Sequence, residues 1–469
     1  MRTLIATITL VLLAAIAAPA AVAAEPERAP EGEPGEAYAP GELLVRFRGG
    51  GERLLELPGP VTVEEAAAAL RSNPAVAYAL PNYLARASAV PDDPGLAGAP
   101  GDWRRLQWNF LPCGSLCGDS AAPLPFEARG GIDATGAWDL LRARGAPGGK
   151  GTRVAVLDTG VAFRARKPRF RKSPDFKRKQ FTRGLDVVSA SAKKNKRKRK
   201  RKRRPPPLDR DGHGTHVAGT IAERTDNGVA LTGLAHRAKV IPVRVLDSQG
   251  LGTARDIAKG IRFAAKNKAD VINMSFEFSL AVDSCRKIKS VCRAIRFAAR
   301  RGAVVVSAAG NSNGEPVAFP AGAPRVIGVG RVTKDACLAD QSRTGTGLDI
   351  VAPGGGVPLS SDCGVDDGMF SREVPIYQLT FAGGGFKRFG FPPFYEGTSM
   401  AAAHVSGVAA LVVASRVLGG DPSPSQVECQ LRATARRGAA QLGQPYDPRL
   451  FGSGLVDAAD AVRARAAGC

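Results

Sequence analysis

Several features that would indicate other classes of protein are scarce or missing in this chain of 469 residues. It has only four histidines, and none of them lies near a Cys-x-x-Cys spacing, which argues against a zinc site. Beyond the N-terminus no stretch approaches the roughly 18 apolar residues of a membrane-spanning helix, so we expect no membrane span. No continuous Asp/Asn-rich loop demands calcium, and no internal repeat is apparent.

Acidic residues are also scarce, with 43 Asp and Glu against 66 Lys and Arg and a net charge of +23. The excess is concentrated in residues 161–208, which hold 21 Lys and Arg but only two acidic residues. The densest part runs from Lys193 to Arg204. Because a block of like charges repels itself and buries nothing, we expect a disordered insertion here. Such a run could also bind a polyanion, such as nucleic acid, a teichoic-acid-like polymer or acidic lipid, or serve as a processing site for a protease.

The N-terminus has the three parts of an export signal. Arg2 precedes an apolar run over residues 4–18, and Pro19 and small residues up to Ala24 follow it. This order predicts a signal peptide over residues 1–24, with an N-terminal membrane anchor as the alternative. We therefore expect a secreted, extracellular protein.

All eight cysteines lie after residue 110. An even number of cysteines in an exported chain favours disulfides, although eight cysteines permit 105 pairings. We expect each cysteine to pair with its nearest neighbour in the sequence. The expected bridges are 113–117, 285–292, 337–363 and 429–469.

Three short segments carry residue types that act together in covalent catalysis. Asp158 follows an apolar run, His213 stands between two glycines, and Ser399 precedes small helix-forming residues. A serine hydroxyl is a weak nucleophile until a histidine takes its proton, and a carboxylate holds that histidine in place. Each segment alone is explained as well by a turn or a helix cap. Together, however, they follow the chain order Asp, His, Ser of a known class of triads.

Asn311 follows the segment 307–310 after an expected strand. A side-chain amide at this point can donate to the oxyanion of a tetrahedral intermediate, beside the backbone N–H of Ser399. By itself, an Asn after Gly is usually a turn residue. The other histidines, which we interpret as structural, are His216, His236 and His404.

These four motifs resemble the subtilases, the subtilisin-like serine endopeptidases of peptidase family S8, over roughly residues 41–90 and 103–465. The resemblance implies that Asp158, His213 and Ser399 form a catalytic triad and that Asn311 completes an oxyanion hole. It implies no cofactor for the chemistry, whereas a structural calcium ion, frequent in the family, stays open. The substrate would bind as an extended strand along the edge of the cleft.

The resemblance also implies a primary specificity pocket. The chain departs from the family pattern beside this pocket, with Phe276 where leucine is usual and Glu277 where glycine is usual. If the Glu277 carboxylate lies near the substrate, it would bias the enzyme toward basic side chains. The other expected lining residues are Asn273, Met274, Ser275, Ala308, Ala309 and Gly310.

Apolar runs alternate with helical segments through the larger part of the chain. Strands without polar alternation, separated by helices, predict a parallel sheet that is buried on both faces. With the resemblance, this predicts an α/β fold, a subtilisin-like three-layer domain with a mainly parallel central sheet. The expected strands are 153–157, 239–245, 269–274, 303–308, 325–329 and 348–351, and the expected helices are 213–222, 253–267, 285–301, 399–416 and 425–435.

A smaller unit precedes this domain. Residues 42–48 and 75–82 predict strands and 63–71 a helix, a small α+β unit that resembles the inhibitor-like propeptide of subtilases. An independent binding module is the alternative. We expect a signal peptide over 1–24, a linker and propeptide over 25–90, and a catalytic domain over 91–469 with the basic insertion at about 161–208.

Two functions fit these observations. The first is a secreted, monomeric serine endopeptidase that hydrolyses polypeptides through an acyl-enzyme, is made as a self-processing precursor, and is inhibited by its own propeptide. The alternative is a polyanion- or surface-binding protein on an inactive protease scaffold. The intact set of Asp, His, Ser and Asn motifs favours the first, because a binding role does not require it.

Overall fold

The computed structural model describes residues 38–57, 61–87, 103–117, 127–188, 205–225, 227, 229–360, 363, 374–438 and 445–469. The predicted signal peptide and the basic run from Lys193 to Arg204 lie outside the described residues.

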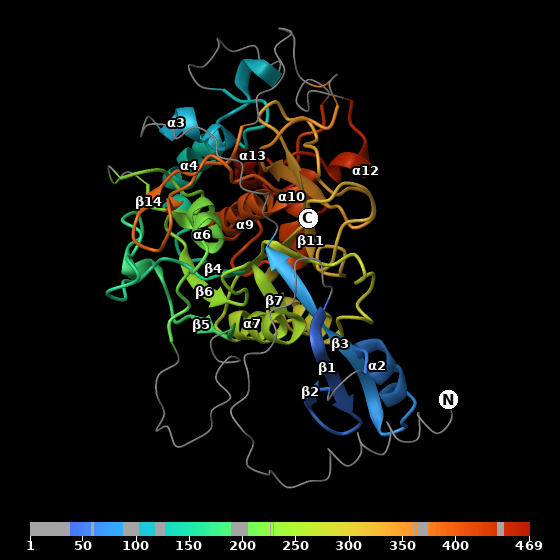
Figure 1. Ribbon diagram of the computed structural model, residues 1–469. Helices are drawn as coiled ribbons and strands as arrows, with labels where there is room; N and C mark the ends of the chain where they lie inside the picture. Colours follow the sequence, from blue (N-terminus) through green and yellow to red (C-terminus); the bar gives the residue numbers. More distant parts are fainter. Residues whose placement is uncertain are drawn as a thin grey trace.

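A parallel sheet of seven strands forms the centre of the larger domain (Figure 1). Its strand order is β12-β11-β10-β8-β4-β6-β5, and every neighbouring pair is parallel. Successive side chains of a strand point to opposite faces, and both faces are apolar here. Val154 and Val156 belong to one core cluster, whereas Ala155 and Leu157 belong to the other. The strands are β4 (Arg153–Asp158), β5 (Leu185–Asp186), β6 (Lys239–Arg244), β8 (Val271–Met274), β10 (Val304–Ala308), β11 (Ile327–Val332) and β12 (Ile350–Pro353).

Helices cover both faces of this sheet and complete three layers, which confirms the predicted fold class. One core cluster includes α4, α6, α9, α10 and α13, and the other includes α7 and α8. Figure 1 shows α6 and α9 on the side of the sheet opposite α7. The bounds are α4 (Ala134–Ala143), α6 (His213–Ala222), α7 (Ala254–Lys266), α8 (Lys289–Ala299), α9 (Thr398–Ser415), α10 (Pro424–Ala433) and α13 (Ala458–Arg463). Shorter elements are α3 (Trp103–Leu106), α12 (Pro448–Phe451), β13 (Thr380–Phe381), β14 (Phe389–Gly390), η1 (Trp108–Phe110), η2 (Gly114–Cys117), η3 (Pro147–Gly149) and η4 (Arg178–Gln180).

Helix α9 corrects one expectation from the sequence. By length and composition it is apolar enough to cross a membrane, although we expected no such segment after the N-terminus. In the structure 94% of that apolar window is buried inside the protein. Its apolar character is therefore that of a core helix, which contacts other parts of the protein on all sides.

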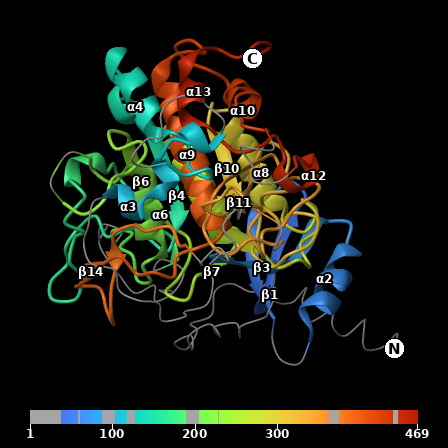
Figure 2. The same cartoon turned by 90° about the horizontal axis from the view of Figure 1, so that it is seen from above.

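The N-terminal unit consists of three antiparallel strands and one helix; the sequence indicated the helix and two of these strands but not β2. Thr62 and Glu65 form a reciprocal capping box at the start of α2, which satisfies N–H groups that a helix leaves unpaired. Figures 1 and 2 both show the unit at the periphery of the main domain. Its elements are β1 (Tyr38–Phe47), β2 (Glu52–Glu56), α2 (Val63–Arg71) and β3 (Val76–Ala87).

Strand β3 extends beyond this unit and joins the larger domain (Figure 1). Its last residues pair antiparallel with β7 (Leu251–Thr253) on one side and with β9 (Phe276–Phe278) on the other. Arg86 stands opposite Glu277 in this ladder. The N-terminal segment thus occupies a slot between two short strands of the larger domain.

The structure corrects the expected extent of the disordered insertion. Residues 161–188 are folded, with Val161 and Phe176 fully buried and with β5 paired to β6. The prediction failed because the cationic side chains of this segment, such as Arg164 and Lys167, are exposed, whereas apolar side chains of the same segment, such as Phe163 and Phe176, enter the core. The prediction was therefore wrong for this part of 161–208.

The predicted disulfide pairing is confirmed. The four bridges are Cys113–Cys117, Cys285–Cys292, Cys337–Cys363 and Cys429–Cys469. The last bridge joins the C-terminal residue to α10 across 40 residues of sequence.

Candidate active site

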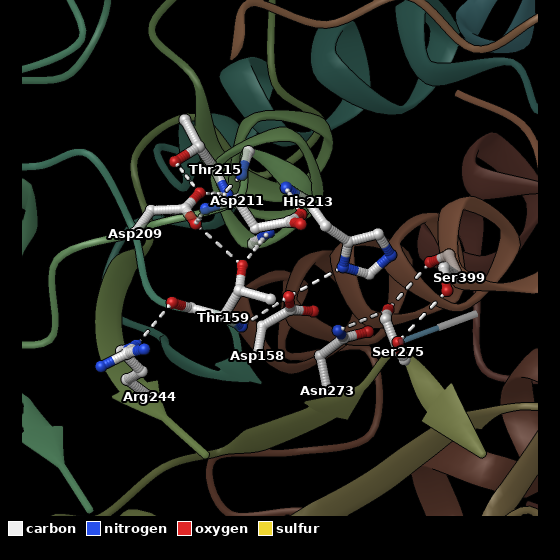
Figure 3. Close-up of polar contacts among 12 residues, drawn as sticks. Asp158, Thr159, Asp209, Asp211, His213, Thr215, Arg244, Asn273, Ser275 and Ser399 are labelled. Carbon is white, nitrogen blue, oxygen red and sulfur yellow. Dashed lines mark hydrogen bonds and ion pairs between the residues drawn. The ribbon is translucent and has the colours of Figure 1, made fainter. Parts of the chain in front are cut away.

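The three residues of the predicted triad come from three elements. Asp158 is the last residue of β4, at the carboxyl edge of the parallel sheet, where reacting groups gather in such folds. His213 is the first residue of α6, and Ser399 is the second residue of α9. All three side chains are buried. The fold therefore brings segments that are far apart in sequence to one edge of the sheet (Figure 3).

Asp158 and His213 form a short buried hydrogen bond. The Nδ1 atom of His213 lies 2.7 Å from Oδ1 of Asp158, and this oxygen also accepts from the N–H of Thr159 at 2.7 Å. Burial acts to lower the pKa of His213, but the carboxylates of Asp158, Asp211 and Asp209 together outweigh it and raise that pKa above its ordinary value. The pair is thus arranged to fix the imidazole and to stabilise its protonated form.

A second buried carboxylate, Asp209, ties the two motifs together (Figure 3). Its Oδ1 accepts from the Thr159 hydroxyl at 2.8 Å, and its Oδ2 accepts from the Thr215 N–H at 2.9 Å. The Thr159 hydroxyl in turn accepts from the N–H of Gly214 at 3.0 Å. Gly214 allows this close approach, since a Cβ there would lie 2.2 Å from the carbonyl oxygen of Gly160. Our sequence reasoning missed Asp209 and Thr159, although both lie beside the motifs.

The Ser399 hydroxyl is oriented toward the protein in this structure. Its Oγ donates to the carbonyl oxygen of Ser275 at 3.2 Å, and Nε2 of His213 has no hydrogen-bond partner among the described residues. Figure 3 shows the imidazole between Asp158 and Ser399, with its second nitrogen on the side of Ser399. A change of the serine rotamer is therefore needed to form the hydrogen bond, which often becomes short only when substrate is bound.

A buried polar chain supports the start of α9 from the neighbouring strand. The Ser275 hydroxyl donates to the carbonyl of Ser399 at 2.9 Å and accepts from Nδ2 of Asn273 at 2.9 Å. The Oδ1 of Asn273 accepts from the Ser406 hydroxyl at 2.9 Å. Asn273 and Ser275 thus contact the serine segment through a network whose donors and acceptors are matched, which stiffens such sites.

The amide of Asn311 has a fixed orientation. Its Oδ1 accepts from the backbone N–H of Thr398 at 2.9 Å and from the Thr398 hydroxyl at 3.0 Å. Because a backbone N–H can only donate, the carbonyl end of the amide must face α9. The Nδ2 donor therefore points away from Thr398, and it is buried without a partner among the described residues. An unpaired buried donor is costly, and such groups are found where a function requires them.

Comparison with known proteins gives a consistent result. Residues 149–454 match the subtilase family of S8 peptidases. The chain belongs to the subtilase family. It is 31% identical over 350 residues to a thermophilic serine proteinase of Bacillus sp. (strain AK1), a match over 75% of this chain and 66% of that protein. It is 32% identical over 315 residues to subtilisin Savinase of Lederbergia lenta, over 67% of this chain and 92% of that protein.

Two further similarities extend this comparison. An extracellular protease of Xanthomonas campestris pv. campestris is 34% identical over 354 residues, 71% of this chain and 54% of that protein. A solved protease of Pseudoalteromonas arctica PAMC 21717 superposes with a TM-score of 0.55 at 32% identity, over 71% of this chain and 94% of that one. The chain spans just under two thirds of two of these relatives, 66% of the Bacillus sp. AK1 proteinase and 65% of alkaline elastase YaB of Bacillus sp. (strain YaB).

Of the residues predicted to line the pocket of this subtilase, Phe276 and Glu277 lie on β9, which borders the slot that β3 occupies. Met274, Phe276, Ala308 and Ala309 are fully buried in the core clusters. These side chains are inaccessible to solvent while β3 occupies the slot. Glu277, in contrast, is partly exposed, and its Oε1 accepts from the N–H of Asn311 at 3.4 Å.

The other histidines of the subtilase have structural surroundings, as the sequence indicated. Burial lowers the pKa of His216 to about 3, and the ring contacts the carbonyl of Ile376 at 2.8 Å. Burial likewise lowers the pKa of His404 to about 4, and its two nitrogens contact the Met400 carbonyl and Asn109. His236 packs edge-on against Trp138. Neither His216 nor His404 can act as a base toward Ser399 while these contacts persist.

Proposed function

We propose that this protein is a serine endopeptidase that cleaves polypeptides through an acyl-enzyme. The observation that carries the proposal is the buried hydrogen bond of 2.7 Å between Asp158 and His213, whose Nε2 has no partner in the described part of the chain and faces the side of Ser399. In the first step the Ser399 oxygen attacks the substrate carbonyl while Nε2 of His213 takes the hydroxyl proton. His213 then gives this proton to the leaving amine, and water repeats the sequence to release the acid.

We propose that two hydrogen-bond donors bind the negative oxygen of the tetrahedral intermediate. One is Nδ2 of Asn311, which is buried and unpaired among the described residues. The other is the N–H of Ser399 in the first turn of α9, where the helix dipole also favours negative charge. Because Thr398 already holds the carbonyl end of the amide, the Nδ2 donor needs no reorientation when charge develops.

We infer that substrates bind as an extended strand between β7 and β9. The support is β3, whose last residues already pair with both strands in antiparallel fashion. A peptide in this slot gains backbone hydrogen bonds from two sides, which suits a protease that must accept many sequences. It follows that the protein's own N-terminal segment acts as an inhibitor until it is cleaved and leaves.

Contacts outside the slot also support this inhibitory role. The buried ring of Tyr78 on β3 faces two cations of α8, with Lys289 Nζ 4.9 Å and the Arg293 guanidinium carbon 5.2 Å from its centroid. Cations so placed over an aromatic ring contribute about 0.5–2 kcal/mol each. The N-terminal unit is thus held by a docking surface as well as by the strand.

We further propose that the protein is secreted and matures by self-processing. The Xanthomonas relative is described as extracellular, and four disulfides in this chain fit an oxidising destination. A monomeric state and polyanion binding through the run from Lys193 to Arg204 stay predictions.

A calcium ion would fit one buried pair of oxygens. Oδ2 of Asp175 and Oδ1 of Asn227 have no partner among the described residues, and Nδ2 of Asn227 donates to the other Asp175 oxygen at 2.6 Å. Burial raises the pKa of Asp175 to about 6, although the hydrogen bond from Asn227 and the nearby cations Arg224 and Lys172 act to lower it. Carboxylate and amide oxygens are the ligands that calcium prefers. Calcium takes about six to eight oxygen ligands, so we propose that these two residues would supply only part of a structural calcium site. The described residues contain no group of three or more His, Cys, Asp or Glu that could hold a metal.

The decisive experiment compares the precursor with its Ser399→Ala form. We expect the wild type to lose its N-terminal segment, to hydrolyse a mixed peptide library and to react at Ser399 with a serine-directed organophosphate. The variant should do none of these while remaining folded by circular dichroism. Hydrolysis by the Ser399→Ala protein would refute the proposed chemistry.

A further inference from the structure

Glu277 has an unusual position beside the proposed oxyanion donor. Its side chain folds over Gly310, so that a Cβ added at Gly310 would lie 2.4 Å from Oε2 of Glu277. The other carboxylate oxygen accepts from the backbone N–H of Asn311 at 3.4 Å. The carboxylate therefore lies against Gly310 and Asn311, and Asn311 carries the proposed oxyanion donor.

This carboxylate has no cation at ion-pair distance among the described residues. Arg343 is the nearest candidate, but its guanidinium is bonded to the Pro316 carbonyl at 2.7 Å and the Ser312 hydroxyl at 3.1 Å. Burial raises the pKa of Glu277 in spite of the Asn311 N–H and the more distant Arg343. A partly buried carboxylate without a cation is costly, and a cationic ligand would remove that cost.

The strand register places Glu277 on the face that a substrate side chain would use. Arg86 of β3 stands directly opposite Glu277, and the pairing continues to Phe276. In a substrate chain with the same register, the residue after the one opposite Phe276 would lie opposite Ser275. The carbonyl oxygen of Ser275 contacts the nucleophile Ser399. That substrate residue carries the bond to be cleaved.

Side chains two residues apart on a strand point to the same face. The substrate residue opposite Ser275 and the one opposite Glu277 therefore share the face toward which the Glu277 side chain is directed. Diagonal neighbours of this kind lie about 7–8 Å apart, within reach of a long side chain such as lysine or arginine.

We propose that Glu277 is a specificity-determining residue that selects substrates with lysine or arginine immediately before the cleaved bond. This proposal rests on the proposed peptidase function and deepens it. A substrate ammonium or guanidinium group would take the place beside the carboxylate that Arg343 does not fill. The competing explanation is that Glu277 only obstructs the slot and excludes large side chains.

The test uses peptides that differ only in the residue before the cleaved bond, namely Lys, Arg, Gln, Leu or Phe. They are cleaved by the matured wild type and by Glu277→Gln, which keeps the shape but removes the charge. A charge-assisted hydrogen bond corresponds to about 10- to 100-fold in kcat/KM. We expect the wild type to cleave the Lys and Arg peptides with a kcat/KM higher by this factor than that of the Gln peptide. In Glu277→Gln this difference should disappear, while kcat/KM for the Leu peptide stays unchanged. Asp139→Asn, an equal change of charge at an exposed site on α4, should keep the wild-type profile.

Other outcomes have distinct meanings. Equal kcat/KM for Lys, Arg and Gln peptides in the wild type would overturn the proposal, whatever the variant does. An unchanged Lys preference in Glu277→Gln would overturn it as well. Faster cleavage of Leu and Phe peptides by Glu277→Gly, with no Lys preference in the wild type, would identify Glu277 as an obstruction. If no peptide is cleaved in a Ser399-dependent way, the peptidase function itself fails.

Discussion

Asn311 has two roles, one in catalysis and one in stability, and two different substitutions should affect them separately. Its Oδ1 caps the N–H and hydroxyl of Thr398, while its Nδ2 is unpaired among the described residues. Asn311→Asp retains an oxygen toward Thr398 but replaces the donor by a second acceptor. Asn311→Leu removes both functions.

The expected magnitudes follow from these contacts. Loss of the side-chain donor should lower kcat about 10²- to 10³-fold, or about 2.7–4 kcal/mol, a value measured in subtilisin itself, the type case of the effect. The Asp variant should lose at least as much, because its carboxylate repels the oxyanion. The Leu variant should in addition lose about 1–3 kcal/mol of unfolding free energy, since it leaves the Thr398 donors unsatisfied.

The assay is steady-state hydrolysis of one peptide by the matured enzymes, with urea unfolding in parallel. Asn313→Asp adds the same charge at an exposed site two residues away and should retain wild-type kcat. We expect KM to change little, because the donor acts on charge that develops only in the transition state. A wild-type kcat in both Asn311 variants would refute the assignment of Nδ2 to the oxyanion.

Three further predictions concern pH, the C-terminal bridge and calcium. The pKa of His213 is raised, and His213 must be neutral to act as the base. In a pH–rate profile, kcat/KM should therefore fall as pH decreases through an apparent pKa above that of an ordinary histidine. An apparent pKa at or below the ordinary one would contradict this prediction. Replacing Cys429 and Cys469 by serine should cost about 4 kcal/mol in the chain-entropy model, against about 2–3 kcal/mol for the shorter 285–292 bridge, as urea unfolding would show. Chelation with EGTA should lower Tm and added calcium should restore it; an unchanged Tm would argue against the calcium site proposed above.

The sequence predicted the elements that local patterns determine. The apolar runs that became β4, β6, β8 and β10 carry no polar alternation, which is typical of strands covered on both faces. The catalytic motifs were equally visible, because each requires particular residue types next to one another. The geometry of Asp158 and His213 followed once β4 and α6 were placed.

Other features depend on contacts that no local pattern contains. Strands β5, β7 and β9 have only two or three residues, too few for a periodicity, and exist because a neighbouring chain segment pairs with them. Asp209 lies in an irregular segment, and its role arises only when that segment meets the turn after β4. Only the Asp-x-Asp-x-His order before His213 could have indicated it.

The location of Ser399 on α9 has a consequence for how the protein loses activity. The helix is buried along nearly its whole length, and the serine lies in its first turn rather than on a surface loop. Displacing the nucleophile therefore requires opening the centre of the molecule, not the fraying of an edge. Partial damage at the periphery should leave the hydrolytic machinery intact, so that inactivation by heat becomes an all-or-none event governed by the barrier to global unfolding.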